Sequence, residues 1–268
     1  MNQIDDLLPG GVRYARQGHR VTLTIDRPER RNAMTFQTLA SLRDGVRRAR
    51  AEDDVRVLVL TGAGEQAFCS GADLGGLRAE DLDAADAHEG RGHLAELFDA
   101  LWSSGIPTIA RVRGYALAGG FGLALACDIV IAADDATFGA PEAAIGLWPY
   151  MITVPLIRSM PPKTALELMM TARRVSAAEG QRLGFVNEVV PAGKLDKAVA
   201  QTAERIAAQS PTAIRLGRTS FYQVLGTGVD QALALLQATL SVATATGDAQ
   251  EGVAAFAEKR PPQWGARP

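Results

Sequence analysis

The sequence predicts an α/β fold in which ββα units stack into a spiral, followed by a helical region at the C-terminal end. Two patterns favour it. Apolar, strand-like runs are each followed by a glycine-rich loop and a helical pattern, and this order recurs without sequence identity between the copies. After Pro161 the pattern becomes mainly helical. We therefore expect a spiral core at 1–208 and a C-terminal helical region at 209–268.

The first half of the core begins with VTLTID at 21–26, where apolar and polar residues alternate as in a half-buried strand. The turn RPERRNA follows, and Thr35 is placed to cap a helix that runs to about Arg50. VRVLVL at 55–60 is a β-branched run that predicts a buried strand. It leads into the glycine-rich segment TGAGEQAFCSGADL.

The second half repeats this order. A helix at about 94–103 leads to a strand TIARVRGYA at 108–116, then to a glycine cluster and a helix at 121–126. DIVIAADDATFGAPE predicts a pair of strands. Ser176 and Glu179 match a capping box, and Ser210 precedes Pro211 as an N-cap precedes the first helical position. Helices are then expected to continue to about Glu258.

Composition limits the classes of partner. The chain of 268 residues has 47% hydrophobic and 22% charged residues and a formal net charge of -2, so no basic field favours nucleic acid or an anionic membrane. The N-terminal stretch MNQIDDLLPGG resembles neither a signal nor a transit peptide, and the longest uncharged runs are too short for a membrane span. We therefore expect a cytoplasmic protein.

Metal binding and disulfide formation are not favoured. Cys69 and Cys127 are far apart and no CxxC pair occurs, so buried free thiols are expected. HEGRGH at 88–93 is similar to a zinc-protease helix, but its histidines are at i and i+5 rather than i and i+4, and Gly90 and Gly92 interrupt it. We interpret it as a mobile surface segment and expect no metal site.

Two glycine-rich loops, CSGADL and LAGGFG, each follow a predicted strand. Where such loops face each other, backbone N–H groups without bulky side chains over them can point at one oxygen and form an oxyanion hole. Neither loop carries a P-loop GK[ST] or a GxGxxG that opens a helix. Taken alone, the glycines favour tight turns or packing over catalysis.

Five segments taken together carry a family resemblance. IDRPERRNAM, VRVLVLTGAGEQAFCSGADL, GYALAGGFGLALACDIVIAADDATFGAPEAAIGL, RRVSAAEGQRLGFVNEVV and EGVAAFAEKRPPQW resemble the crotonase superfamily of enoyl-CoA hydratases and isomerases over about residues 10–265. The resemblance implies a crotonase-like spiral with a C-terminal trimerisation region, a homotrimer or dimer of trimers, and acyl-CoA thioester substrates. Coenzyme A is then part of the substrate, and no separate cofactor is expected.

The resemblance also implies site residues. It assigns the oxyanion-hole amides to Ala72 and Gly119. Hydratases of the family carry two glutamates 20 positions apart, and the matching positions here are Gly122 and Glu142. Only one of the two carboxylates is therefore present. In an apolar setting Glu142 would have the raised pKa suited to proton transfer, although a capping or ion-pair role is the plainer alternative.

One carboxylate favours one of three possible activities. Adding water across a double bond uses two acid–base groups, whereas one carboxylate can move a proton from C2 to C4. We therefore favour isomerisation of 3-enoyl-CoA to 2-enoyl-CoA. The alternatives are a 2-enoyl-CoA hydratase with a substitute acid, for which Tyr150 is the candidate, and a catalytically weak acyl-CoA-binding protein. Packing alone is the slightly favoured role for Trp148, Tyr150 and Met151.

For coenzyme A, the resemblance points to the RPERRNA loop, the backbone near Ser70, and the last helix, of the same or a neighbouring subunit. The residues implied in binding are Arg31, Ala33, Ser70, Ala72, Phe256 and Lys259. Arg31, Lys259 and Arg260 are candidate phosphate contacts, with solvated surface charges as the alternative. The apolar stretch 231–245 is expected to form the contact between subunits.

Overall fold

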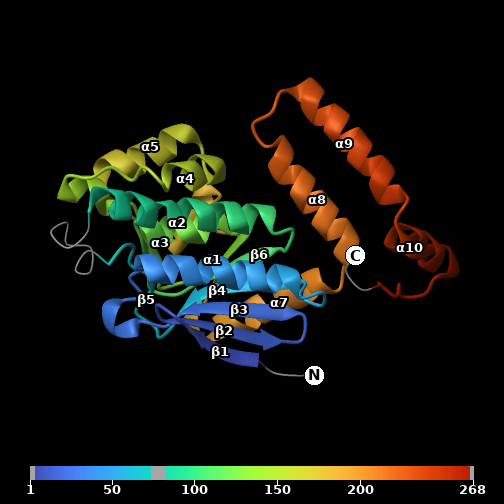
Figure 1. Ribbon diagram of the computed structural model, residues 1–268, viewed down its shortest axis with the longest axis horizontal. Coiled ribbons are helices and arrows are strands. Elements are labelled where there is room, and N and C mark those ends of the chain that lie inside the picture. The colour runs from blue at the N-terminus through green and yellow to red at the C-terminus, as the bar shows by residue number, and fades with distance from the viewer. Residues whose placement is uncertain (1–3, 74–82, 266–268) are drawn as a thin grey trace.

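A computed structural model describes residues 4–73 and 83–265 (Figure 1). Within them, the larger sheet has seven strands in the order β1-β2-β3-β4-β6-β8-β11. These are β1 (Ile4–Leu8), β2 (Val12–Gln17), β3 (Arg20–Ile25), β4 (Val57–Gly62), β6 (Thr108–Val112), β8 (Ile129–Ala133) and β11 (Glu188–Val190). The first three pair antiparallel, and the pairs from β3 to β11 are all parallel.

A smaller sheet has the order β10-β9-β7-β5 in the described residues. Its strands are β5 (Ala67–Cys69), β7 (Tyr115–Leu117), β9 (Thr137–Gly139) and β10 (Arg174–Ser176). Each unit of the fold places one strand in the larger sheet, the next in the smaller sheet, and then a helix. Thus β4 and β5 precede α2 (Ala84–Ser103), and β6 and β7 precede α3 (Gly119–Ala126). The predicted spiral of ββα units is confirmed.

The predicted strand 108–116 is wrong in one respect, because a turn divides it into β6 and β7 in different sheets. Gly114 lies at this turn with φ of +64°, in the left-handed region that favours glycine. A Cβ at Gly114 would lie 2.1 Å from the carbonyl oxygen of Gln66, so a larger residue would not fit. Sequence periodicity missed the turn because the apolar run continues on both sides of it.

The core lies on both faces of the larger sheet. One face packs against α1 (Phe36–Ala51) and α2, and the other against α7 (Leu195–Ala207). Thr35 caps α1 as predicted: its hydroxyl accepts from the Thr38 N–H at 3.1 Å, and the Thr38 hydroxyl accepts from the Thr35 N–H at 3.3 Å. Both cysteines are buried and free, as expected.

The segment HEGRGH is helical, and its residues His88, Glu89 and Arg91 are exposed, as expected of a surface segment. It belongs to α2, which begins ten residues before the predicted start at 94. A Cβ at Gly90 would lie 2.2 Å from the Phe36 ring, so glycine lets α2 approach the start of α1 closely. His93 contacts Glu96 at 3.3 Å and also Arg43. No cluster of potential metal ligands occurs in 4–73 or 83–265.

Short elements connect the spiral to the C-terminal region. They are η1 (Pro28–Arg30), η2 (Pro141–Ile145), α4 (Thr153–Ser159), α5 (Pro162–Thr171), α6 (Ala177–Leu183) and η3 (Ala192–Lys194). Ser176 accepts from the Glu179 N–H at 3.2 Å and caps α6. The Glu179 carboxylate instead accepts from Arg173 at 2.8 Å, so only half of the predicted capping box forms.

The C-terminal region consists of α8 (Pro211–Val224), α9 (Val229–Thr244) and α10 (Gly247–Glu258). Ser210 caps α8 as predicted, accepting from the Ala213 N–H at 3.0 Å. In Figure 1, α8 and α9 form an antiparallel pair that extends away from the spiral. None of the helices in the described part of the chain is long and apolar enough to cross a membrane.

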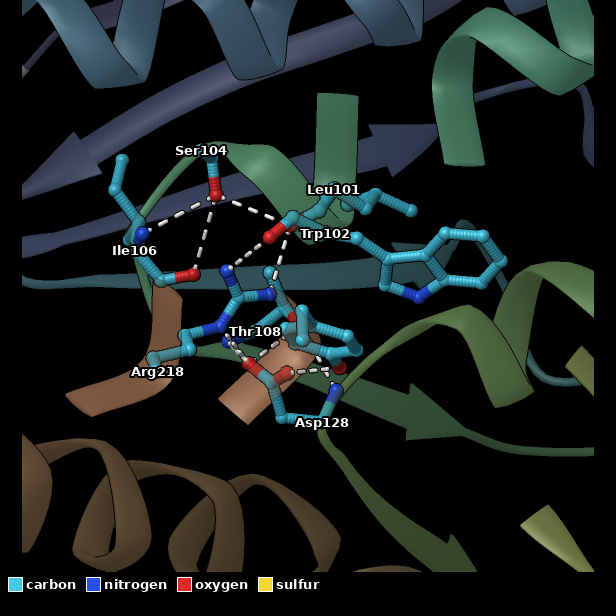
Figure 2. A network of polar contacts seen from close by, with 8 residues as sticks. Leu101, Trp102, Ser104, Ile106, Thr108, Asp128 and Arg218 are labelled. Carbon is cyan, nitrogen blue, oxygen red and sulfur yellow. Dashed lines mark hydrogen bonds and ion pairs between the residues drawn. The ribbon is translucent and has the colours of Figure 1, made fainter. Parts of the chain in front are cut away.

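One polar network fastens α8 to the spiral (Figure 2). The Asp128 carboxylate, just after α3, accepts from Arg218 Nε at 2.7 Å and from the Tyr222 hydroxyl at 2.6 Å. It also accepts from the Thr108 N–H at 2.7 Å, at the start of β6. Two further Arg218 nitrogens donate to the carbonyls of Leu101 and Trp102 in the last turn of α2. This network joins α2, α3, β6 and α8.

Candidate active site

Three neighbouring parallel strands bring the candidate residues to one edge of the smaller sheet. β5 pairs with β7 and β7 with β9, all parallel, so their carboxyl ends lie side by side. The loop after β5 carries Ala72, the turn after β7 carries Gly119, and η2 after β9 carries Glu142. Ligand sites in α/β proteins are commonly formed at the carboxyl ends of parallel strands. The topology therefore gathers residues that are far apart in sequence.

The two glycine-rich loops touch each other. Gly71 has φ of +101°, and a Cβ built on it would lie 2.8 Å from the Ala118 Cβ and 3.4 Å from the Gly119 nitrogen. A side chain at this position would therefore push the loop after β5 away from the turn after β7. The expected juxtaposition of these loops is present in the structure.

The Gly119 amide is the first N–H of α3, where helix geometry provides no intrahelical acceptor. The preceding residue, Ala118, has φ of 50° and ψ of -127°, a conformation that L residues rarely adopt. Such strain costs about 1–3 kcal/mol and is concentrated at functional sites. The Gly119 N–H and the positive end of the helix dipole together favour an anion at this point.

The Ala72 amide is positioned by a short parallel bridge to Met34. Met34 donates to the Gly71 carbonyl at 2.8 Å and accepts from the Asp73 N–H at 2.9 Å. In this pattern the N–H of Ala72 itself points away from Met34. It donates to no protein acceptor in the described part of the chain, and Ala72 is exposed. Two free N–H donors are thus present on two touching loops.

Glu142 is the candidate proton carrier. Its Oε2 atom is buried and makes no hydrogen bond to any described residue. Burial raises the pKa of Glu142 above the ordinary value of 4.5, and a hydrogen bond from its own backbone opposes this only in part. The ion-pair alternative finds no partner among the described residues, and the hydrogen bond that the carboxylate accepts comes from the backbone of Glu142 itself. A carboxylate with one buried, unpartnered oxygen and a raised pKa is suited to accept and return a proton.

Gly122 is buried in the first turns of α3, next to Ile152 at the start of α4. A Cβ at Gly122 would lie 2.2 Å from Ile152 Cγ2 and 2.6 Å from Ile152 Cβ. The position that carries a second glutamate in hydratases therefore has no room here for any side chain. Sequence reasoning missed Ile152, since nothing in the spacing pairs it with Gly122.

Tyr150, the candidate substitute acid, is 77% exposed. Its hydroxyl makes no hydrogen bond to any residue in 4–73 or 83–265, whereas Trp148 packs partly against the core. The structure thus places Tyr150 at the surface, whereas Glu142 is partly buried and its Oε2 atom is fully so.

The coenzyme A candidates of the RPERRNA loop lie beside the loop after β5. Ser70 donates its N–H to the Arg31 carbonyl at 3.1 Å, and Arg31 is exposed with φ of 50°. Ala33 is buried, and its carbonyl accepts from the Arg27 guanidinium. Arg27 also pairs with Asp73 at 2.9 Å. Arg31, Ala33, Ser70 and Ala72 are therefore brought together.

Asn32 holds these loops in place, and sequence reasoning did not single it out. It is fully buried, and its amide donates to the carbonyls of Ala63 at 2.9 Å and Ala67 at 2.6 Å. Its side-chain oxygen accepts from the Arg27 N–H at 3.1 Å. The available signal was an asparagine inside a turn, a residue type that tolerates the positive φ of 56° found here.

The last helix lies apart from these loops within one chain. In Figure 1, α10 is well separated from β5, and Phe256 on it is 87% exposed. Lys259 ends α10 and is exposed as well. The Arg260 guanidinium donates to Glu251 at 2.6 and 3.0 Å and to Glu258 at 2.6 Å, so it is not free to bind a phosphate. This pairing lowers the pKa of Glu251 to about 2.

Comparison with known proteins decides the family. The family model described as enoyl-CoA hydratase/isomerase matches residues 17–267. The chain belongs to the enoyl-CoA hydratase/isomerase family. It is 37% identical to a putative enoyl-CoA hydratase of Thermus thermophilus over 92% of this chain and 98% of the relative. It is 35% identical to the crotonyl-CoA hydratase of Syntrophomonas wolfei over 89% of this chain and 91% of the relative.

Solved structures of the family share the fold. An enoyl-CoA hydratase from Mycobacterium smegmatis superposes with a TM-score of 0.88 at 32% identity, covering 98% of both chains. Human enoyl coenzyme A hydratase domain-containing protein 3 superposes with a TM-score of 0.91 at 29% identity, covering 95% of this chain and 100% of the other. The predicted crotonase-like fold is therefore confirmed, and the family implies an acyl-CoA thioester substrate.

Proposed function

We propose that this protein isomerises 3-enoyl-CoA to 2-enoyl-CoA with Glu142 as its single proton carrier. The observation that carries this proposal is the buried Oε2 atom of Glu142, which has no hydrogen-bond partner among the described residues, together with the absence of a side chain at Gly122. One carboxylate of raised pKa is sufficient for a proton shuttle between two carbons of the same substrate. Water addition is more demanding because water must be activated while another proton is delivered.

In this mechanism the ionised Glu142 carboxylate removes a proton from C2 of the 3-enoyl thioester. The electron pair of the C2–H bond forms a C1–C2 double bond, and negative charge moves to the thioester oxygen. The N–H groups of Ala72 and Gly119 donate to that oxygen, and each such donor stabilises the transition state by about 2.7–4 kcal/mol. The protonated Glu142 then delivers its proton to C4, the charge returns, and the double bond lies between C2 and C3.

Binding of the coenzyme A portion is assigned to two places. Arg31, Ala33 and Ser70 flank the Ala72 loop in the same chain. Phe256 and Lys259 would reach a site only from the α10 helix of another copy, since they are distant from it within one chain. We therefore propose a homotrimer or a dimer of trimers, and a cytoplasmic protein that uses no cofactor besides the coenzyme A of its substrate. The exposed apolar residues of α9 support the assembly.

Two other functions remain as alternatives with distinct support. The names of the relatives favour a hydratase, in which Tyr150 or a bound water would replace the second acid. The missing carboxylate at Gly122 is also compatible with a catalytically weak acyl-CoA-binding protein. Retention of a buried Glu142 favours catalysis over binding alone.

The deciding experiment assays the purified chain with 3-enoyl-CoA and 2-enoyl-CoA and compares Glu142→Gln with the wild type. Isomerisation should exceed hydration in the wild type and fall by about 10²-fold or more in Glu142→Gln, with coenzyme A binding retained by calorimetry. Glu65→Gln, at a side chain that is 74% exposed, is the control and should change neither activity. Hydration without isomerisation would establish the hydratase alternative. Binding of acyl-CoA without either reaction would establish a catalytically weak acyl-CoA-binding protein.

A further inference from the structure

The contact between Gly122 and Ile152 bears on which reaction the site can perform. Gly122 follows Gly119 by three residues in α3, so the two positions lie on the same face of the helix. Gly119 offers its N–H to the thioester oxygen in the proposed function. A side chain at Gly122 would therefore project beside the substrate, where a second acid–base group is useful.

Ile152 occupies that space in a way that a change of rotamer cannot relieve. Its Cγ2 lies 2.2 Å and its Cβ 2.6 Å from the Cβ position of Gly122, while its Cα lies at 3.4 Å. Rotation about χ1 moves Cγ2 but leaves Cβ in place. Any residue with a Cβ at Ile152 therefore conflicts with any residue with a Cβ at Gly122, and only a second glycine removes both close contacts.

The position of Ile152 is itself well determined. It is 2% exposed, belongs to the main apolar core, and precedes the first turn of α4. Its carbonyl accepts from the Leu156 N–H at 3.0 Å, which ties it to that helix. Protein cores are packed closely enough that a displacement of α4 from α3 would be felt across the interface.

We propose that Ile152 determines reaction specificity by filling the space beside Gly122 that a second acid–base group would need, which restricts the site to proton transfer by Glu142. The inference rests on the proposed function for the role of Glu142. In this proposal an apolar residue, which is not one of the two carboxylate positions, decides whether the site can use one carboxylate or two.

The test uses paired substitutions. The double variant with Gly122→Glu and Ile152→Gly should acquire hydration of 2-enoyl-CoA. Its matched control, with Gly122→Ala and Ile152→Gly, lacks the carboxylate. The rate of hydration should be at least about 10²-fold higher in the first variant than in the control. Gly122→Glu combined with Ile152→Ala should not acquire hydration, because the alanine Cβ remains 2.6 Å from the new Cβ. Equal hydration by the glutamate and alanine members of the glycine pair would overturn the proposal.

Melting temperatures test the same contact without reference to activity. Gly122→Ala should lower the melting temperature, and combining it with Ile152→Gly should cost less than the sum of the two single changes. A Gly122→Ala variant as stable as the wild type would overturn the proposal. A protein with both Gly122→Glu and Ile152→Gly that does not fold would also overturn it, because something other than Ile152 would then exclude the side chain. Failure of the proposed function is a separate result, because the wild-type protein would then show no isomerisation.

Discussion

Arg218 on α8 and Asp128 at the end of α3 form an ion pair, with 2.7 Å between Nε and Oδ2 and side chains only 8% and 20% exposed. The pair links the C-terminal helices to the same helix whose first residue, Gly119, is a candidate oxyanion donor. Burial raises the pKa of Tyr222, with the neighbouring Asp128 charge adding to the effect, so its hydroxyl remains a donor to that carboxylate.

Arg218→Met keeps most of the aliphatic part of the side chain but removes the guanidinium that donates to the Asp128 carboxylate and to two α2 carbonyls. We expect a loss of about 3 kcal/mol in the free energy of unfolding, because removing one partner of a buried pair leaves an uncompensated charge. Chemical denaturation measures it. Arg47→Met removes a guanidinium that is 62% exposed and should change stability by less than about 0.5 kcal/mol. Equal effects of the two changes would contradict the role given to Arg218.

The pH dependence of isomerisation should reflect the raised pKa of Glu142. The carboxylate must be ionised to remove the C2 proton, so the rate should increase as pH rises through a pKa above the ordinary 4.5. For stability the sign is opposite. A raised carboxyl pKa favours the folded state below the unfolded pKa, and this contribution is lost as pH rises through the folded value. Glu142→Gln should therefore abolish the activity profile without loss of stability at neutral pH, and an unchanged acid limb in this variant would exclude Glu142.

Gly71→Ala tests the contact between the two glycine-rich loops. The new Cβ would lie 2.8 Å from the Ala118 Cβ, and the shift this forces should reduce kcat by about 10²-fold. Gly184→Ala is a matched control, because Gly184 also has a positive φ, of +91°, but a Cβ there meets nothing within 4 Å. Both variants should lose stability from backbone strain. Only Gly71→Ala should lose activity, and a comparable activity loss in both would show that strain alone is responsible.

Asn32→Ala should loosen the RPERRNA loop. It removes two donors to buried carbonyls and one acceptor, so we expect about 2–3 kcal/mol of destabilisation. Weaker coenzyme A binding by calorimetry should accompany it, since Arg31 and Ala33 flank this residue. Gln37→Ala, at an exposed position of α1, serves as the control. Unchanged affinity in folded Asn32→Ala would separate this loop from coenzyme A binding.

The apolar surface of α9 should mediate association. The helix has no buried residue in the isolated chain, and Leu233 and Leu240 are 62% and 63% exposed. We expect wild-type protein to sediment as a trimer or hexamer at micromolar concentration. Leu240→Asp should shift it toward smaller species because a charge is costly to bury in an apolar contact, whereas Gln237→Asp should shift it less. A wild-type monomer would contradict the assembly.

Local signals in the sequence were sufficient for much of the fold. Thr35 and Ser210 were predicted as helix caps and act as such, because a cap depends on residues within three positions of it. The order of strands, glycine loops and helices also predicted the spiral, since strand and helix periodicities are local. The break at Gly114 escaped the same reasoning, because it depends on a contact with Gln66, which is distant in sequence. The early start of α2 had a local signal that was missed, since the Asp83 side chain caps the helix by accepting from the N–H groups of Ala85 and Asp86.

The sequence by itself therefore determined the family, the crotonase-like fold and the presence of one carboxylate where hydratases carry two. Only the tertiary structure decided that Gly122 has no space beside it, that Oε2 of Glu142 is buried without a partner, and that Asp128 anchors α8. The physical reason is that free space, burial and ion pairs depend on groups that packing brings together. Ile152 is 30 residues from Gly122, and Arg218 is 90 residues from Asp128, so no local pattern records either contact.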